Sequence, residues 1–142
     1  MVSQPMELGA LADVILRIAR SIEPHRFGLD PLTDTESAVL QWVDRHPGTS
    51  PSATAAATAL HKSNVSVALK SLEAHGLVER TRDPQDARLV RVSTTTQARQ
   101  NIDHLYREWS ACLTEALGGD LADVGETLAT LTRIEKGLRP AN

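Results

Sequence analysis

The sequence predicts a mainly α-helical protein with one small β-hairpin. Apolar residues recur at spacings of three and four over most of the chain, as they do along one face of a helix. Within residues 77–92 the pattern changes to the alternation that is typical of strands. The 142 residues, 41% of them hydrophobic and 23% charged, suit one globular domain with its own core. We therefore expect a single domain over residues 1–142.

The first predicted helix spans residues 7–22 and ends before Pro24. A loop over residues 23–33 follows, because glycine and proline recur there. Thr33 and Glu36 then form a capping box, in which each side chain satisfies a free backbone N–H of a helix that runs to about His46. We expect this helix to bury Val39, Trp42 and Val43, and the first helix to present an apolar stripe of Leu8, Leu11, Ile15, Ile18 and Ile22.

Two short helices are predicted next. Ser50 followed by Pro51 is a typical helix start with serine as the N-cap, and it opens an alanine-rich helix that ends at about Leu60. Ser63 is expected to cap a further helix over residues 64–75, and Gly76 to end it at the usual C′ position. The buried stripe of this second helix comprises Val65, Ala68, Leu69 and Leu72.

A basic hairpin and two long helices complete the predicted order. Residues 77–80 and 89–92 are the expected strands, because Asp83-Pro84-Gln85-Asp86 between them has the composition of a turn. Helices are then expected over residues 96–117 and 121–138, on either side of Gly118-Gly119.

This order of short helix, tight turn, second helix and hairpin is that of a winged helix-turn-helix. In that fold the second helix enters the DNA major groove and the hairpin lies against a neighbouring groove. The outward face of residues 63–75 carries short hydroxyl, amide and methyl groups that can bond base edges or phosphates and contact thymine. An ordinary polar surface helix, the alternative, would mix glutamate with lysine. The outward residues are Ser63, Asn64, Ser66, Val67, Lys70, Ser71 and Ala74.

The net charge of −3 hides a basic segment. Residues 61–91 carry a net charge of +2, whereas the rest of the chain carries −5. Arg82 and Arg88 flank the hairpin tip, where an arginine can enter a narrow minor groove. Asp83 and Asp86 either hold such an arginine and the N–H groups of the turn or serve only to form the turn. From charge alone, a solvated charged face remains the alternative. The candidate DNA contacts are Ser50, Ser52, His61, Lys62, Ser63, Asn64, Ser66, Val67, Lys70, Ser71, Arg80, Arg82, Asp86, Arg88 and Arg91.

Several short motifs follow one another in an order found in one family. They are Leu32-Thr33, His46-Pro47-Gly48, Asn64-Val65-Ser66, Leu72-Glu73, Gly76-Leu77-Val78-Glu79-Arg80 and Asp83-Pro84-Gln85-Asp86-Ala87-Arg88. Over nearly its whole length the chain thus resembles the MarR (multiple-antibiotic-resistance regulator) family. The resemblance implies a homodimeric transcriptional regulator whose recognition helix contacts the major groove and whose Arg88 contacts the minor groove. Two departures are Val67 and Ser71, where many members are basic, and Thr94-Thr95-Thr96-Gln97-Ala98, where members usually have a Leu-Thr pair.

The terminal helices carry more apolar surface than one small winged domain can cover. A second copy of the chain is the expected cover, and packing within the monomer is the alternative. The resemblance implies that residues 1–30 and 96–142 form the dimer around a DNA-binding lobe of residues 31–95. Two recognition helices one DNA turn apart then predict a pseudo-palindromic operator. The candidate interface residues are Leu8, Leu11, Ile15, Ile18, Leu113, Leu117, Leu128 and Leu131.

A small-molecule effector is implied by the same resemblance. Members commonly release DNA when a small phenolic or otherwise apolar anion binds between the dimer helices and the DNA-binding lobe. The residues that could hold it are Arg17, His25, Trp42 and Trp109, although an arginine and two tryptophans are more often surface and core residues. Redox sensing by Cys112 is disfavoured because no cation lies near it in the sequence. The histidines do not cluster, so neither a metal nor a cofactor is expected.

Other classes of protein fit the sequence poorly. No glycine-rich phosphate loop, nucleophile elbow or HExxH motif occurs, so we do not expect an enzyme. No apolar run approaches a membrane span and no leader pattern opens the chain, so we expect a cytoplasmic protein without a membrane partner. The alternative that remains is a winged-helix dimer without operator specificity, acting as a protein-binding or antirepressor module. The negative net charge supports that alternative.

Overall fold

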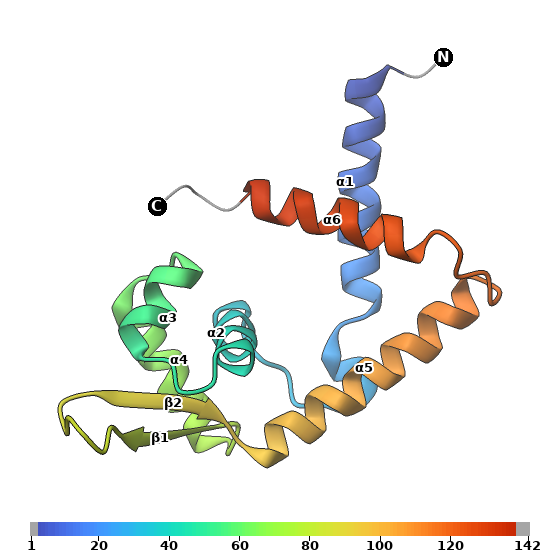
Figure 1. Cartoon of the computed structure of the whole chain (residues 1–142). Coiled ribbons are helices and arrows are strands. Elements are labelled where there is room, and N and C mark those ends of the chain that lie inside the picture. Colours follow the sequence, from blue (N-terminus) through green and yellow to red (C-terminus); the bar gives the residue numbers. More distant parts are fainter. Residues whose placement is uncertain (1–2, 139–142) are drawn as a thin grey trace. The chain divides into compact units, whose positions relative to one another are not determined.

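The computed structural model describes residues 3–138, and it confirms a mainly α-helical chain with one antiparallel hairpin (Figure 1). The chain divides into two compact units, one ending at Pro31 and the other beginning at Leu32. The first unit contains α1 (Gln4–Ser21) and a 3-10 turn, η1 (Pro24–Phe27). The second contains α2 (Asp34–Arg45), α3 (Pro51–Thr58), α4 (Lys62–Ala74), β1 (Val78–Arg82), β2 (Val90–Thr94), α5 (Thr96–Ala116) and α6 (Val124–Leu138).

The predicted caps of α2 and α3 are present, with one difference in detail. Thr33 Oγ1 accepts the Glu36 N–H at 3.1 Å, and Ser50 Oγ accepts the Ala53 N–H at the same distance. The Glu36 carboxylate accepts the Thr33 hydroxyl at 3.2 Å, whereas a full capping box would have it accept the Thr33 backbone N–H. Each helix therefore starts where its local sequence provides an oxygen for the free N–H groups of the first turn.

The start of α4 corrects the sequence prediction. The helix begins at Lys62 with His61 as the N-cap, and no side chain caps it, so Ser63 lies inside the first turn. The end of α4 agrees with the prediction. Gly76 follows the helix with φ of 71°, a left-handed conformation that glycine adopts without strain.

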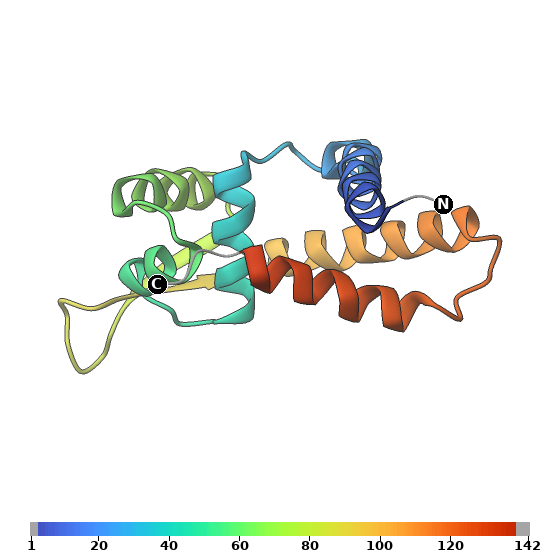
Figure 2. The ribbon, with the colours of Figure 1, turned by 90° about the horizontal axis from the view of Figure 1, so that it is seen from above.

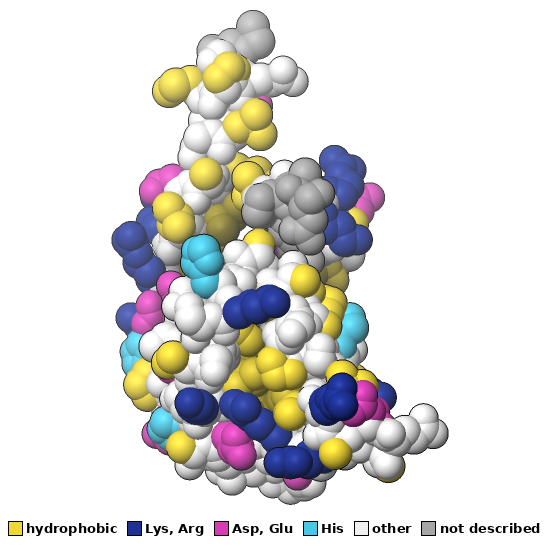
Figure 3. All heavy atoms as spheres, turned by 90° about the vertical axis from the view of Figure 1, so that its left-hand side faces the viewer, with side chains coloured by type: hydrophobic (Ala, Val, Ile, Leu, Met, Phe, Trp, Pro, Cys, Tyr) yellow, Lys and Arg dark blue, Asp and Glu magenta, His cyan; other side chains and the backbone are white. Residues whose placement is uncertain are grey.

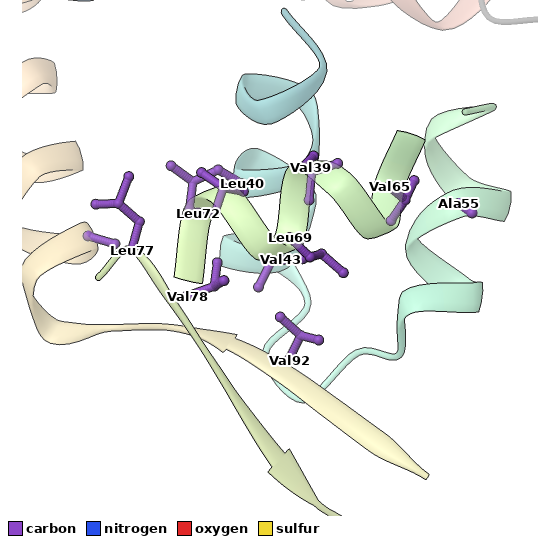
Figure 4. Close-up of a cluster of buried hydrophobic side chains, with 12 residues drawn as sticks. Val39, Leu40, Val43, Ala55, Val65, Leu69, Leu72, Leu77, Val78 and Val92 are labelled. Atoms are coloured by element: carbon purple, nitrogen blue, oxygen red, sulfur yellow. The ribbon is translucent and has the colours of Figure 1, made fainter. Parts of the chain in front are cut away.

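The core of the second unit forms where α2, α3 and α4 meet the hairpin (Figure 4). The predicted stripe of α4 is buried, and Leu69 and Leu72 are fully enclosed. Trp42 is only half-buried, contrary to the prediction, and stacks on His46 with the ring centroids 3.5 Å apart. Leu40 enters the core from α2 instead, together with Val39 and Val43.

The hairpin pairs Val78 with Thr94 and Arg82 with Val90, so each strand is shifted slightly toward the C-terminus of its predicted range. It is also tied to the turn between α2 and α3. Val92 N donates to Thr49 O at 2.7 Å, and Gly48 N donates to Val92 O at 3.0 Å. Beyond this tie the hairpin projects past α3 and α4, which both views show (Figures 1 and 2). It is therefore the wing that the sequence predicts.

Thr95 joins the wing to α5. Its hydroxyl accepts the Ala98 N–H at 3.1 Å, which caps α5, and donates to Gly76 O at 2.6 Å beyond the end of α4. Helix α5 then leads away from the end of β2 (Figure 2). The described helices α1 and α6 bury none of their residues. None of the helices within residues 3–138 has the length and apolar character that crossing a membrane requires.

Candidate nucleic-acid interface

Helix α4 has one side buried in the core and the opposite side exposed. With Val65, Leu69 and Leu72 in the core, every third or fourth residue on the opposite side faces outward. Over residues 62–71 this face carries two lysines and no carboxylate. The exposed side chains are Lys62, Ser63, Asn64, Ser66, Val67 and Lys70, while Ser71 is half-buried.

Helix α3 supports α4 rather than widening its charged surface. Thr54 and Ala55 are buried, and small side chains at these positions let the two helices approach closely. The hydroxyl of Ser50 is engaged in the cap of α3, whereas Ser52 is exposed. His61 is exposed at the N-cap of α4. The neighbourhood of the α4 N-terminus therefore combines exposed hydroxyl, imidazole and ammonium groups.

Arg80 differs from the other candidate arginines because it is held against the body of the lobe. Its Nε lies 3.0 Å from Glu73 Oε2, an ion pair without hydrogen-bond geometry, and its Nε and Nη2 are shielded from solvent. The pair also explains the single carboxylate near the end of α4. Arg80 is therefore a structural cation in this conformation.

Arg91 joins the wing to the turn between α2 and α3. Its Nε donates to Asp83 Oδ2 at 2.7 Å, and its Nη1 donates to Gly48 O at 3.3 Å in the turn between α2 and α3. The Asp83 side chain is only 9% exposed. The bond from Gln85 N and then the Arg91 guanidinium hold the pKa of Asp83 below its ordinary value of 3.8. This carboxylate thus stays ionised and joins the turn of the wing to Arg91, and Arg91 in turn bonds to the lobe.

The wing tip leaves two arginines free. Asp86 Oδ1 accepts the Arg88 backbone N–H at 3.0 Å, so this carboxylate shapes the turn. The side chains of Arg82 and Arg88 are exposed, and neither guanidinium has a partner within residues 3–138. Figure 3 shows the molecule from the left-hand side of Figure 1, and in its lower half Lys and Arg side chains surround an apolar patch.

The sequence left open whether Asp83 holds an arginine or only forms the turn. The bond between Arg91 and the carbonyl of Gly48 was not predicted. The register of the hairpin places Asp83 and Arg91 diagonally across the strands, which is within reach of a long side chain. Counting from the turn could have found this pair. The carbonyl of Gly48 could not have been found in this way, because it lies 43 residues away in the sequence.

The candidate effector residues each have a neighbour of their own. Arg17 pairs with Asp13 on α1, and His25 Nδ1 lies 3.2 Å from Glu23 Oε2. In the second unit Trp42 stacks on His46, and its indole Nε1 is buried without a hydrogen-bond partner. Trp109 packs edge-on against Tyr106, with the ring centroids 5.9 Å apart.

The candidate dimer residues are largely uncovered in the single chain. Leu8 is 65% exposed and Leu128 is 64% exposed, and Ile18, Leu113, Leu117 and Leu131 are also exposed. Leu11 and Ile15 are half-buried. Cys112 lies exposed on α5. Within residues 3–138, no three His, Cys, Asp or Glu side chains come together as a metal site requires.

The chain was compared with family models, curated sequences and solved structures. A family model described as the MarR family matches residues 30–89. No curated protein sequence matches the chain. The chain is similar to the solved structure of FabT from Streptococcus pneumoniae in complex with DNA, with a TM-score of 0.74, 20% identity and coverage of 96% of this chain and 100% of that one.

Two further structures are similar at higher identity. The transcriptional regulator BldR from Sulfolobus solfataricus has a TM-score of 0.64 and 26% identity, covering 96% of this chain and 100% of that one. The transcriptional repressor CouR bound to a 23-mer DNA duplex has a TM-score of 0.66 and 25% identity, covering 92% of this chain and 90% of that one. Residues 30–89 thus match the MarR family, and over nearly its whole length the chain shares its fold with solved transcription regulators.

Proposed function

We propose that the chain is a sequence-specific regulator that binds double-stranded DNA. The observation that carries this proposal is the exposed face of α4 over residues 62–71, with two lysines and no carboxylate, in the same lobe as a wing whose Arg82 and Arg88 are free. Such a helix suits the major groove, and arginines at a hairpin tip suit the adjacent minor groove. The DNA complexes of FabT and CouR support the proposal.

The regulator acts as a homodimer on a pseudo-palindromic operator. The exposed leucines of α1, α5 and α6 support this proposal, because large apolar side chains that one chain leaves uncovered on each of these helices call for a partner. A two-fold dimer presents two copies of α4 to half-sites one helical turn apart. Sedimentation of the free protein at micromolar concentration is expected to give a dimer.

The regulator is a repressor that a small phenolic or otherwise apolar anion releases from DNA. The printed description of CouR as a repressor supports the first part of this proposal. Trp42 and Trp109 make the second part measurable, because a ligand that binds near either indole changes its emission. Phenolic carboxylates are expected to lower DNA affinity and change tryptophan emission together. A series that changes neither would contradict release by this class of ligand.

The function is tested by selecting duplexes from a random DNA pool and titrating the winner at several salt concentrations. Each phosphate contact contributes about −0.9 to the slope of log affinity against log salt. The four free cations Lys62, Lys70, Arg82 and Arg88 in each of two protomers predict a slope of about −7. Recovery of a pseudo-palindrome with half-sites one turn apart supports the proposal.

The second candidate function is a protein-binding or antirepressor module, which the net charge of −3 favours. Recovery of no preferred sequence, with only weak and steeply salt-dependent binding, would favour this module and refute the operator-binding regulator.

A further inference from the structure

Val67 is an exposed apolar side chain in the middle of the DNA-facing helix. It is 68% exposed, although a valine gains nothing for the fold from such a position and has a lower helix propensity than alanine or lysine. Leu69, two residues along the helix, is fully buried. Because two residues turn a helix by about 200°, Val67 points almost directly away from the core.

The surroundings of Val67 decide what can cover it. Lys62 and Lys70 lie on the same exposed side of α4, and no carboxylate occurs between them. A positive face of this kind attracts a polyanion. The groups closest to Val67 along the helix are hydroxyls and an amide, from Ser63, Asn64 and Ser66, which suit the polar edges of bases. A nucleic acid that also presents an apolar group fits both features of this face.

The major groove of DNA presents only one such group, the 5-methyl of thymine. RNA does not fit, because uracil lacks this methyl and the major groove of an A-form helix is too deep and narrow for side chains to read. These observations together favour an A·T base pair opposite the centre of α4.

We infer that Val67 is a specificity-determining residue that reads one thymine in each operator half-site through its 5-methyl group. This inference rests on the proposed function and adds the base that the site selects. Contact between a valine methyl and the thymine methyl removes both from water. Since burial of one CH₂ group contributes a free energy equal to about a fourfold change in affinity, the expected loss is about fourfold per half-site and about fifteenfold for both.

The test uses the full-length protein and the operator recovered by selection. Each thymine is replaced in turn by deoxyuridine, which removes the methyl group and leaves base pairing unchanged. Wild-type protein is expected to lose about fourfold in affinity at one thymine per half-site. Val67→Ala, which changes both protomers of the dimer, is expected to bind the unmodified operator about fifteenfold more weakly and to lose nothing further at that thymine. Because Val67 is exposed, thermal unfolding of the variant should match that of the wild type.

Ser66→Ala is the matched control, because Ser66 lies on the same exposed face and its replacement removes a hydroxyl but no methyl. This variant is expected to keep the full deoxyuridine penalty. An operator without a deoxyuridine-sensitive thymine, or a penalty that persists in Val67→Ala, would overturn the inference while leaving the regulator intact. Failure of the selection to recover any preferred duplex would instead overturn the proposed function and this inference with it.

Discussion

Replacement of Arg88 by alanine separates DNA binding from folding. The Arg88 guanidinium is exposed and has no partner within residues 3–138, whereas its backbone N–H is bonded to Asp86. The alanine variant keeps that backbone bond, so the turn at the wing tip is expected to persist. A surface replacement without lost contacts changes the free energy of unfolding by less than about 0.5 kcal/mol. The variant should therefore be as stable as the wild type.

DNA binding by the same variant should fall markedly. A lost groove contact costs about 1 to 3 kcal/mol per wing. Each wing also loses one cation near the phosphates, so the salt slope of a dimer should become shallower by about 2. Fluorescence anisotropy titrations of the selected operator at several potassium chloride concentrations measure both quantities in one experiment.

Arg107→Ala is the matched control for this experiment. Arg107 is exposed on α5, so its replacement makes the same change in net charge outside the candidate interface. This control is expected to leave both the affinity and the salt slope close to wild type. Equal effects of the two replacements would show that only net charge matters, and an Arg88→Ala protein with wild-type affinity and slope would refute the placement of the wing in a groove.

Three further predictions concern the scaffold. Leu69→Ala should lower the free energy of unfolding by about 2 to 5 kcal/mol in denaturant titrations, because Leu69 is fully buried, and a loss under about 1 kcal/mol would contradict the described core. Thr95→Val should cost about 1 to 2 kcal/mol, because it removes the cap of α5 and the bond to Gly76, whereas Thr95→Ser keeps both bonds, and equal losses in the two variants would exclude this role of the hydroxyl. The pKa of Asp83 is lowered in the folded chain, so its stabilising effect is present above the ordinary value of 3.8 and is lost as the pH falls through the lower folded value. Wild type and Asp83→Asn should therefore differ in thermal unfolding at neutral pH and converge in acid, and a difference that stays constant would show that the charge of Asp83 is not responsible.

The sequence alone determined the order and most of the ends of the elements. Thr33 and Ser50 accept N–H groups in the first turn of the helix that each precedes, and Gly76 adopts the left-handed conformation after α4, because these signals act over three or four residues. Ser63 was placed wrongly as a cap because a serine just inside a helix and one just before it have the same local pattern. Periodicity likewise indicated that α2 has a buried face. It did not show that Leu40, and not Trp42, is buried on that face.

Tertiary structure decided which cations of the candidate interface are free. Arg80, Arg82, Arg88 and Arg91 lie within one short basic segment, and no pattern in the sequence separates them. Packing places Glu73 against Arg80, and the hairpin register together with the turn at Gly48 engages Arg91. Arg82 and Arg88 remain available, because both side chains are exposed and neither guanidinium has a partner among the described residues. A side chain is neutralised by groups that are near it in space, and contacts such as that between Arg91 and Gly48 join residues far apart in the chain, so only the folded arrangement determines these distances.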